Sequence, residues 1–365
     1  MNYKKKYLSE AIGFSGKIEG FSGTVAWKSP SNIALIKYWG KRKGQLPMNP
    51  SLSFSLSKSV TVTRMKYRFT DQSEGPVVNY FFAGNRNPDF SARIEPWLKS
   101  LLPYFPFLRN LELEIHSENT FPHSSGIASS ASAFSSLALC LTEIEQRIKK
   151  YPAIGHNFFN KASYIARLGS GSACRSVYEG WVLWGSSSFV SGSSDEIAIP
   201  VNTLVHTEFS AMGDSILVVD DTSKSVSSSA GHAMMNQNPY AKTRFRQAQS
   251  NLNNLLTILS TGDIPEFFNC IEYEALSLHA MMMTSYPGYI LLKPRSLEIM
   301  EKVRQKRKSG LPVGFTVDAG ANIHLLYPLS YRSEMGTFIR DELLRKSQIQ
   351  VIDDYIGKGP ERIGK

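Results

Sequence analysis

Cysteine is scarce in this chain of 365 residues, which contains three: Cys140, Cys174 and Cys270. They lie far apart and form no Cys-x-x-Cys pair, so the sequence indicates neither a disulfide framework nor a structural zinc site. Cys140 lies within an apolar stretch, and we expect it to be a core residue. The absence of paired thiols therefore excludes disulfide-stapled folds and zinc modules as starting interpretations.

Long hydrophobic runs are also missing. No apolar stretch approaches the roughly 20 residues that cross a membrane as a helix. The basic start, Met-Asn-Tyr-Lys-Lys-Lys-Tyr, leads into no apolar signal-peptide core. A hydrophobic fraction of 42% and a charged fraction of 20% are ordinary for a globular protein. We therefore expect a protein that has no membrane partner and resides in the cytoplasm.

Positive charge is in excess, with a formal net charge of +10. Such an excess favours either binding to a nucleic acid or a pocket for a small polyanion. Lysine and arginine are spread over the whole chain, and we interpret the two clusters, Lys4–Lys6 and Lys302–Lys308, as solvated surface. The charge alone does not decide between these interpretations.

The stretch Asn119–Ala131, N-T-F-P-H-S-S-G-I-A-S-S-A, has the clearest chemical character. A strand-like alternation over residues 111–116 precedes it, and an apolar helical pattern continues to about Ile148. Small residues and the N–H groups at a helix start suit a phosphate, and Ser129 and Ser130 add hydroxyl groups. A serine-capped turn is the alternative. No G-K-[ST] follows the glycine, which excludes a Walker A loop.

Lys37 lies among apolar residues in the segment Ser29–Arg42, S-P-S-N-I-A-L-I-K-Y-W-G-K-R. In an extended segment Ile33, Leu35 and Lys37 would face one way. Lys37 is then either a strand residue whose ammonium group reaches water or a cation held for an anionic ligand. Both interpretations stay open at this point.

Two later turns carry further polar groups. In Gly169–Ser176, G-S-G-S-A-C-R-S, the glycines open the backbone, the hydroxyl groups donate, and Arg175 can grip two oxygens. The alternative is a helix end followed by a surface turn. Asp318 follows a strand pattern in F-T-V-D-A-G. It is either a turn former or a carboxylate that points into a cleft.

Periodicity also predicts the organisation of the chain. Strands are expected from Thr24, over Asn49–Ser57, over Thr61–Phe69 and over Ser215–Asp220, and residues 1–20 are expected to be a polar tail or an extra strand. Helices are expected near residues 90–102, with an interruption at Pro96, and near residues 157–168, 240–260, 264–283 and 295–308. A Ser/Gly-rich stretch at 185–194 marks the predicted domain boundary. It divides the chain into an extension (1–24), an N-terminal lobe (25–195) and a C-terminal lobe (196–365).

Together these segments resemble the diphosphomevalonate decarboxylases, a branch of the GHMP kinase superfamily. The matching segments, in the family's order, are N-I-A-L-I-K-Y-W-G-K (Asn32–Lys41), P-M-N-P-S-L-S (Pro47–Ser53), P-x-x-x-G-I-A-S-S-A (Pro122–Ala131), R-x-G-S-G-S-A-C-R-S (Arg167–Ser176) and F-T-V-D-A-G (Phe315–Gly320). The resemblance covers about residues 25–355. It implies a two-lobed α+β fold with a ribosomal-S5-domain-2-like N-terminal lobe for the nucleotide and a ferredoxin-like C-terminal lobe.

The resemblance implies a reaction in which ATP, Mg²⁺ and 5-diphosphomevalonate yield isopentenyl diphosphate, CO₂, ADP and phosphate. Asp318 matches the family's catalytic aspartate, close to the 3-hydroxyl group as base or orienting group. Lys41 would pair with that site and hold Asp318 ionised. Arg175 would bind the substrate carboxylate with two hydrogen bonds.

The remaining site residues also come from the resemblance. The implied substrate pocket consists of Asn32, Lys37, Tyr38, Trp39, Gly40, Lys41, Arg93, Ser170, Gly171, Ser172, Ala173, Cys174, Arg175, Ser228 and Ser229, of which Arg93, Ser228 and Ser229 hold the diphosphate. The implied ATP site consists of Ser117, Asn119, Pro122, Ser125, Gly126, Ile127, Ala128, Ser129 and Ser130, with Mg²⁺ at Ser130. A small-molecule substrate, no nucleic acid and a homodimer are implied as partners.

Several positions depart from the family pattern and keep alternatives open. His123, Ser124 and Ser125 make the phosphate loop more polar, Ala321 replaces a proline, and some bacterial members have arginine where Ser229 stands. The alternatives are decarboxylation of 5-phosphomevalonate, or kinase action on the 3-hydroxyl group of mevalonate. A more distant alternative is a basic nucleic-acid-binding module.

Overall fold

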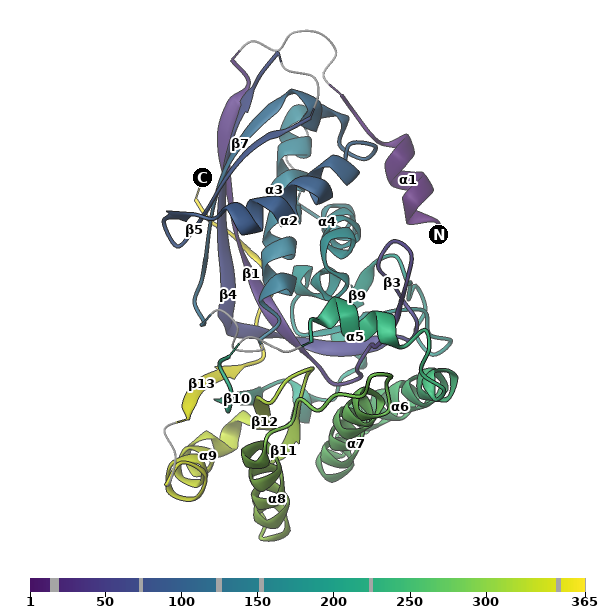
Figure 1. Ribbon diagram of the computed structural model, residues 1–365, viewed down its shortest axis with the longest axis vertical. Helices are drawn as coiled ribbons and strands as arrows, with labels where there is room; N and C mark the ends of the chain where they lie inside the picture. The colour runs from purple at the N-terminus through teal and green to yellow at the C-terminus, as the bar shows by residue number, and fades with distance from the viewer. Residues whose placement is uncertain are drawn as a thin grey trace.

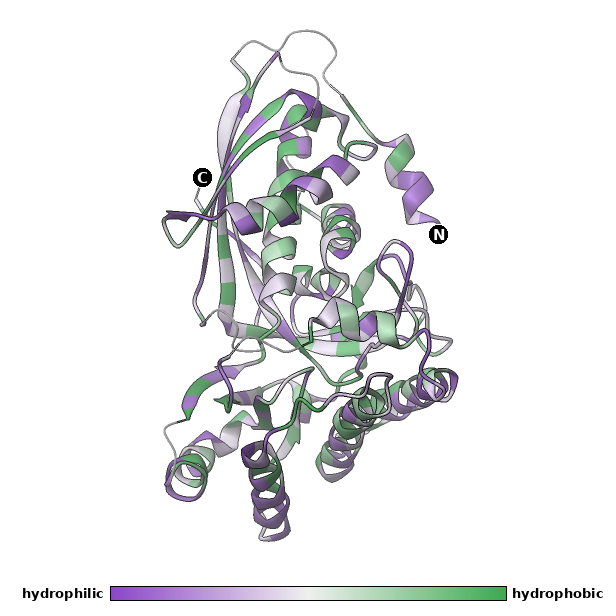
Figure 2. Cartoon of the chain, viewed as in Figure 1, coloured by the Kyte–Doolittle hydropathy of each residue, from purple (hydrophilic) through white to green (hydrophobic). Residues whose placement is uncertain are grey.

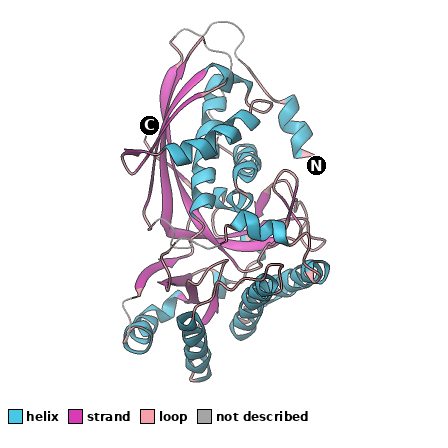
Figure 3. Ribbon diagram, viewed as in Figure 1, coloured by secondary structure: helices cyan, strands magenta, loops and turns pink. Residues whose placement is uncertain are grey.

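The computed structural model of the chain describes residues 1–13, 20–71, 75–122, 127–150, 154–222, 226–345 and 349–364. Figure 1 shows a large sheet with helices packed on one of its faces, and below it a smaller sheet with its own helices. Figure 3 shows the same separation of helices from strands in both parts of the molecule. The arrangement is that of an α+β protein.

The larger sheet has eight strands within the described residues, in the order β14-β1-β4-β7-β5-β6, with β8 added to β4 and β9 added to β8. Its pairs are antiparallel except for β5 with β7. The strands are β1 (Ser22–Ala34), β4 (Ser51–Phe69), β5 (Val77–Phe82), β6 (Asn85–Arg86), β7 (Leu111–Asn119), β8 (Trp181–Trp184), β9 (Ala198–Pro200) and β14 (Glu361–Arg362).

The two strands predicted over residues 49–57 and 61–69 are one long strand, β4, with an irregularity in its middle. Its pairing with β1 shifts between Pro30 and Asn32, so β4 contributes more residues than its partner at that point. The Asp354 carboxylate accepts hydrogen bonds from the backbone N–H groups of Ser57, Lys58 and Ser59 at 3.0, 2.8 and 2.7 Å. Asp354 belongs to the smaller sheet, so this carboxylate ties the two sheets together.

Three helices cover the larger sheet: α2 (Pro88–Ser100), α3 (Ser129–Ile148) and α4 (His156–Gly169). The helix predicted near 90–102 continues through Pro96 without interruption. Buried hydroxyl groups of α3 form hydrogen bonds with hydroxyl groups of β4. The two bonds join Ser132 to Thr61 at 2.6 Å and Ser136 to Thr63 at 2.7 Å. Small side chains at these positions let α3 lie close to β4.

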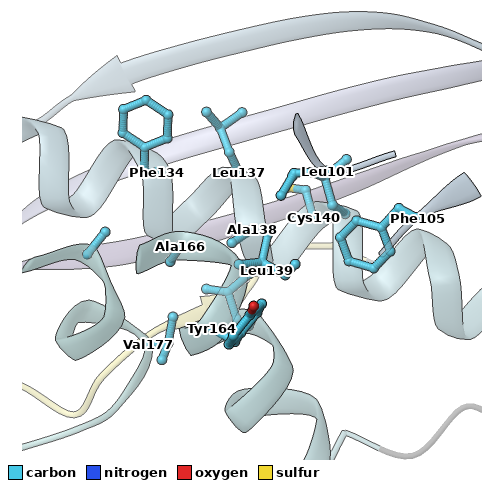
Figure 4. Close-up of a cluster of buried hydrophobic side chains, with 14 of the residues drawn as sticks. Leu101, Phe105, Phe134, Leu137, Ala138, Leu139, Cys140, Tyr164, Ala166 and Val177 are labelled. Carbon is cyan, nitrogen blue, oxygen red and sulfur yellow. The ribbon is translucent and has the colours of Figure 1, made fainter. Parts of the chain in front are cut away.

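The main hydrophobic core lies between these helices and the sheet. Figure 4 shows Phe134, Leu137 and Cys140 of α3 in a cluster with Leu101 and Phe105, which follow α2. Cys140 is fully buried there, as its apolar surroundings in the sequence predict. This core holds α3 in place, and the first turn of α3 is where the predicted phosphate loop ends.

The smaller sheet has the order β11-β12-β10-β13, and all its pairs are antiparallel. Its strands are β10 (Met212–Val218), β11 (Gly314–Thr316), β12 (Ile323–Pro328) and β13 (Gln350–Tyr355), and a separate hairpin is formed by β2 (Lys41–Arg42) and β3 (Leu46–Pro47). The accompanying helices are α5 (Ser228–Met234), α6 (Ala241–Thr261), α7 (Ile264–Met283), α8 (Pro294–Lys308) and α9 (Arg332–Phe338).

Local signals explain the ends of these helices. The Asp263 side chain accepts a hydrogen bond from the N–H of Glu266 and caps α7. Gly262, with φ of +82°, ends α6. The predicted helices at 240–260, 264–283 and 295–308 are therefore confirmed within one residue at each end. Figure 2 shows that α8 is mostly hydrophilic along its length, in keeping with a helix that buries only a narrow face.

A second hydrophobic core joins the two sheets. It combines Ile33, Leu35 and Phe54 from the larger sheet and its edge with Leu252 of α6 and Ile271 of α7. The predicted boundary at residue 195 falls between β8 and β9, which pair with each other in the larger sheet. The chain also returns to that sheet at β14. The division into lobes at residue 195 therefore stays a prediction.

The N-terminal segment corrects one expectation. Residues 1–20 were expected to be a polar tail or a strand, but Tyr3–Ser9 form a helix, α1, because the Asn2 side chain caps it and Tyr7 anchors it. Tyr7 is 1% exposed and packs against Tyr164 of α4, with ring centroids 5.2 Å apart. The Glu196 carboxylate accepts a hydrogen bond from the N–H of Tyr3 at 2.7 Å. The extension is thus docked on α4.

Tyr7→Ala is expected to lower the free energy of unfolding by about 3–5 kcal/mol, because it removes a fully buried aromatic ring. Tyr7→Phe is the matched control. The Tyr7 hydroxyl group is buried without a hydrogen-bond partner in the described structure, so its removal should cost almost nothing or stabilise the fold. Urea unfolding of the three proteins measures both effects, and equal losses in the two variants would contradict this packing.

Candidate active site

A cavity of about 750 Å³ lies where the two sheets and their helices meet. Most of the residues predicted for the substrate and nucleotide line it: Asn32, Lys37, Tyr38, Trp39, Lys41, Arg93, Ile127, Ala128, Ser129, Ser130, Ser170, Gly171, Ser172, Arg175, Ser228, Ser229 and Asp318. They come from segments almost 300 positions apart. Folding therefore brings the separate sequence motifs to one cavity.

Lys37 and Asp318 form an ion pair at one wall of this cavity. The Lys37 Nζ and Asp318 Oδ1 atoms are 2.5 Å apart, and the Lys37 side chain is 2% exposed whereas that of Asp318 is 30% exposed. Burial lowers the pKa of the Lys37 ammonium group, and the Asp318 carboxylate opposes that shift. The carboxylate is thus held beside a buried cation while part of its surface faces the cavity.

This pairing corrects the expectation that Lys41 would be the partner of Asp318. Lys41 lines the same cavity, but it makes no ion pair in the described part of the chain. The reason is the path of the backbone. Strand β1 ends at Ala34, and Ile36 is buried in the same core as Ile33 and Leu35. The alternation expected for an extended strand therefore stops before Lys37.

Backbone hydrogen bonds hold Lys37 in this position. Its N–H donates to the Glu274 carboxylate at 3.0 Å, and its carbonyl oxygen accepts from the side chains of Asn49 at 3.1 Å and Arg244 at 3.3 Å. Glu274 is fully buried, pairs with Arg244 and also accepts from Asn251 at 2.6 Å. Buried groups of α6 and α7 therefore fix a segment that follows β1.

Arg175 lies deep in the same wall and is 3% exposed. Its Nε and Nη2 groups both donate to Asn32 Oδ1, at 3.1 and 3.0 Å, and Nη1 donates to the Ser51 hydroxyl group. These contacts use three of the five N–H donors of a guanidinium group. Arg175 also lines the cavity, and its remaining two N–H groups have no hydrogen-bond acceptor among the described residues.

The turn that carries Arg175 forms a short 3₁₀ helix over Gly171–Val177. A Cβ atom on Gly171 would lie 2.6 Å from the Tyr38 hydroxyl oxygen, so the absence of a side chain lets the Tyr38 ring reach this wall. Ala173 and Cys174 were expected in the substrate pocket. They belong instead to the hydrophobic core behind the turn. With three residues per turn, Ser172 and Arg175 share the side that faces the cavity, whereas Cys174 and Val177 share a side that faces the core.

The first turn of α3 forms the other end of the cavity. Ala128 precedes it with φ of +42°, and no side chain within the described residues caps the helix. The N–H of Ala131 donates to the carbonyl oxygen of Ala128 at 2.7 Å, so the N–H groups of Ser129 and Ser130 are the ones that the described residues leave for a ligand. A 20-residue helix adds a favourable dipole for phosphate. The Ser130 hydroxyl group lies 3.4 Å from that of Ser170. The nucleotide and substrate ends of the cavity thus adjoin.

Some predicted ATP residues lie outside the cavity. Ser117 pairs with Thr63 at 2.7 Å, and Asn119 accepts from the Thr61 hydroxyl group at 2.8 Å, both between neighbouring strands. Gly40 and Pro122 do not line it either. Ser125 and Gly126 fall outside the described residues. The ATP roles predicted for Ser117, Asn119, Pro122, Ser125 and Gly126, and the substrate role predicted for Gly40, stay predictions.

The donor chemistry suits magnesium bound mainly through phosphate oxygens. Mg²⁺ typically takes one or two protein carboxylates or hydroxyl groups together with water and substrate phosphates. The described residues contain no group of three or more His, Cys, Asp and Glu side chains that could hold a metal ion. The hydroxyl group of Ser130 and the carboxylate of Asp318 both face this cavity and fit such a site.

Sequence reasoning missed three buried groups that hold the site. Glu274 and Arg244 lie in helical patterns that look like ordinary amphipathic helices, so no local signal separates them from surface charges. His232 follows the serines at 227–229, and the sequence offers no reason to assign it a role. It lines the cavity, and its Nδ1 atom accepts a hydrogen bond from the N–H of Gly40 at 2.9 Å.

Comparisons with known proteins agree with this geometry. The family model described as "Diphosphomevalonate decarboxylase-like N-terminal domain" matches residues 29–198, and "Mevalonate 5-diphosphate decarboxylase C-terminal domain" matches residues 215–358. The chain is 30% identical to a diphosphomevalonate decarboxylase of Gibberella zeae over 322 residues, covering 82% of this chain and 79% of that one. The chain belongs to the diphosphomevalonate decarboxylase family.

Solved structures of this family have the same fold. A mevalonate diphosphate decarboxylase from Staphylococcus aureus superimposes with a TM-score of 0.80 at 26% identity, over 95% of this chain and 100% of that one. A structure described as "MDDEF in complex with MVAPP, AMPPCP and Magnesium" superimposes with a TM-score of 0.78 at 26% identity, over 94% and 100%. The predicted α+β GHMP-kinase-like fold is confirmed. No helix in the described part of this family member is long and apolar enough to cross a membrane.

Glu274→Gln is expected to destabilise this family member by about 3–5 kcal/mol, because it leaves the buried Arg244 guanidinium without its charge partner. The matched control is the double variant Glu274→Gln with Arg244→Met, which removes both charges and should recover part of that loss. Thermal and urea unfolding measure both proteins. A double variant less stable than Glu274→Gln alone would show that Arg244 does not depend on Glu274.

Proposed function

We propose that this protein catalyses the ATP-dependent decarboxylation of (R)-5-diphosphomevalonate to isopentenyl diphosphate, with release of ADP, phosphate and CO₂. The observation that carries the proposal is the Lys37–Asp318 ion pair beside Arg175 in one cavity. Family membership supports it, since relatives over most of the chain are named diphosphomevalonate decarboxylases. The reaction belongs to the mevalonate pathway of isoprenoid biosynthesis.

Asp318 acts on the 3-hydroxyl group of the substrate. Its carboxylate takes or orients the hydroxyl proton while the oxygen attacks the terminal phosphorus of ATP, and ADP leaves. Lys37 keeps the carboxylate ionised, the role first assigned to Lys41. Lys41 offers a second ammonium group to the same cavity and offsets negative charge that develops during transfer.

The second stage breaks two bonds at the tertiary carbon and its neighbour. The new phosphate leaves with its bonding electrons, the carbon–carboxylate bond supplies the electrons of the new double bond, and CO₂ departs. The two N–H groups of Arg175 that are not used by Asn32 and Ser51 hold the carboxylate in the correct orientation. CO₂ carries no charge and isopentenyl diphosphate has no carboxylate, so the contact with Arg175 ends when CO₂ forms.

ATP and Mg²⁺ complete the site. The first turn of α3 and the Ser129 and Ser130 hydroxyl groups would hold the phosphates, and the structure described with "AMPPCP and Magnesium" supports both ligands for the family. Mg²⁺ would be held at Ser130 and Asp318, and it would supply charge neutralisation to the phosphates. Arg93, Ser228 and Ser229 face the cavity and would hold the diphosphate of the substrate.

The decisive assay offers the purified protein 5-diphosphomevalonate, 5-phosphomevalonate or mevalonate, each with ATP and Mg²⁺. Equal molar amounts of ADP and labelled CO₂ are expected from the diphosphate. Preference for the monophosphate would replace the substrate assignment, and ADP without CO₂ would mean a 3-kinase.

The predicted homodimer, cytoplasmic location and absence of nucleic-acid binding remain predictions. Light scattering tests the homodimer, cell fractionation tests the location, and salt-dependent RNA binding tests the absence of nucleic-acid binding.

Asp318→Asn should lower kcat by about 10²–10⁴-fold and leave KM within a few fold, because the carboxylate acts mainly in the transition state. Lys37→Met should also lower kcat and raise the pKa seen in the acidic limb of the kcat–pH profile, since Asp318 loses its cation. Lys41→Met is the comparison and should leave that pKa unchanged. Near-normal turnover of Asp318→Asn would remove Asp318 from the chemistry.

Arg175→Lys should lower kcat/KM by about 10²-fold or more, because a lysine keeps the charge but offers no two-pronged contact to a carboxylate. The melting temperature must be measured alongside, since Arg175 also bonds Asn32 and Ser51. A stable variant with kcat/KM close to that of the natural protein would exclude Arg175 from carboxylate binding.

A further inference from the structure

The imidazole ring of His232 contacts three consecutive residues of the segment that carries both cavity lysines. Its centroid lies 4.5 Å from that of Tyr38 and 4.4 Å from that of Trp39, with interplanar angles of 33° and 34°. The N–H of Gly40 donates to its Nδ1 atom at 2.9 Å. His232 belongs to α5, the helix that begins with Ser228 and Ser229.

The hydrogen bond from Gly40 fixes the tautomer of the ring. A backbone N–H can only donate, so Nδ1 must be the acceptor and the hydrogen of the neutral ring must be on Nε2. Burial, together with the nearby Lys41 ammonium group, lowers the pKa of His232 to about 3. The ring is therefore a neutral acceptor toward Gly40 at the pH of the cell.

The hydrogen bond to His232 holds the backbone at Gly40, where the chain turns. Its φ of +99° is a conformation that favours glycine, and a Cβ atom there would lie 3.0 Å from the Phe245 ring. Lys37 and Trp39 precede the turn, and Lys41 starts the β2–β3 hairpin after it. Trp39 packs between α6 and α7 in a small core with Leu278 and Met282. The position of the Gly40 N–H therefore determines where the backbone leaves that core toward Lys41.

We propose that His232 is a positioning residue of the reaction, and that its neutral Nε2–H tautomer latches α5 to the turn at Gly40. The His232 latch, meaning the ring with its contacts to Tyr38, Trp39 and Gly40, holds the Ser228 and Ser229 hydroxyl groups and the Lys41 ammonium group in one arrangement around the substrate. This inference rests on the proposed function for what the arrangement binds. It adds a residue that the family resemblance leaves without a role.

Two variants distinguish a packing role of the His232 ring from its role as hydrogen-bond acceptor for Gly40. His232→Phe keeps an aromatic ring against Tyr38 and Trp39 but removes the acceptor for Gly40. His232→Asn loses the ring but can place its Oδ1 atom close to the position of Nδ1. If packing is the whole role, phenylalanine should replace histidine better than asparagine does. If the acceptor matters, the order reverses.

The first test measures the latch without activity. Long-range ¹H–¹⁵N spectra of the natural protein at pH 7 should show His232 as the neutral Nε2–H tautomer. The amide of Gly40 should exchange with deuterium slowly in the natural protein and in His232→Asn, and at least about fivefold faster in His232→Phe, the change expected when a buried donor loses its acceptor. An Nδ1–H tautomer, or equal exchange in all three proteins, overturns the latch.

The second test measures positioning with 5-diphosphomevalonate, ATP and Mg²⁺. His232→Phe should lose about five- to hundredfold in kcat/KM with a melting temperature close to that of the natural protein, and His232→Asn should recover most of that loss. A fully active His232→Phe with a fast-exchanging Gly40 amide would refute the positioning role. If the natural protein turns over no mevalonate ester, the proposed function fails, and the exchange experiment still decides the latch.

Discussion

A buried lysine ammonium group is stabilised by a carboxylate beside it, and for Lys37 this carboxylate belongs to Asp318, 281 positions later in the chain. Moving an ammonium group into a protein interior costs several kcal/mol unless a well-placed partner and further hydrogen bonds offset the loss of hydration. Lys37 follows the larger sheet, and Asp318 lies between β11 and β12 of the smaller one. The ion pair therefore forms only when the two sheets and their helices come together. The cavity lies at the same junction, so the condition for burying Lys37 is also the condition for assembling the site.

The groups behind the ion pair show how this junction is held. The Glu274 carboxylate, fully buried on α7, accepts from the Lys37 N–H and pairs with Arg244 of α6. On the opposite side of the junction, the Asp354 carboxylate accepts three backbone N–H groups where β4 bends. Separating the two parts would break the hydrogen bond between the Lys37 N–H and Glu274 and the three hydrogen bonds to Asp354, in addition to the apolar contact. The reacting groups thus project from a backbone that is fixed from several directions.

Small residues and positive charge complete the chemistry of the cavity. Gly171 leaves room for the Tyr38 ring, and Ala128 adopts a left-handed backbone at the start of α3. Among the described residues, the N–H groups of Ser129 and Ser130 remain for a ligand there, whereas that of Ala131 donates to Ala128. Lys37, Lys41, Arg93 and Arg175 give the cavity four cationic groups, of which Lys37 is paired with Asp318. Of the two interpretations of the net charge, the pocket for a small polyanion accounts for these residues. A phosphorylated substrate with a carboxylate is complementary to them in the sign of its charge.

The amino-acid sequence by itself determined the family, the order of the motifs, the main helices and the residue types of the site, because motif spacing and hydrophobic periodicity are local properties. Asp318, Arg175, Ser129 and Ser130, which the motifs singled out, all line the cavity. Tertiary structure alone decided that Lys37, and not Lys41, meets Asp318, because β1 ends at Ala34 and buried partners on α6 and α7 redirect the backbone. It also decided that Ala173 and Cys174 belong to the core and that His232 faces the Gly40 turn. Such outcomes depend on contacts between segments far apart in the chain, and no periodicity within one segment encodes them.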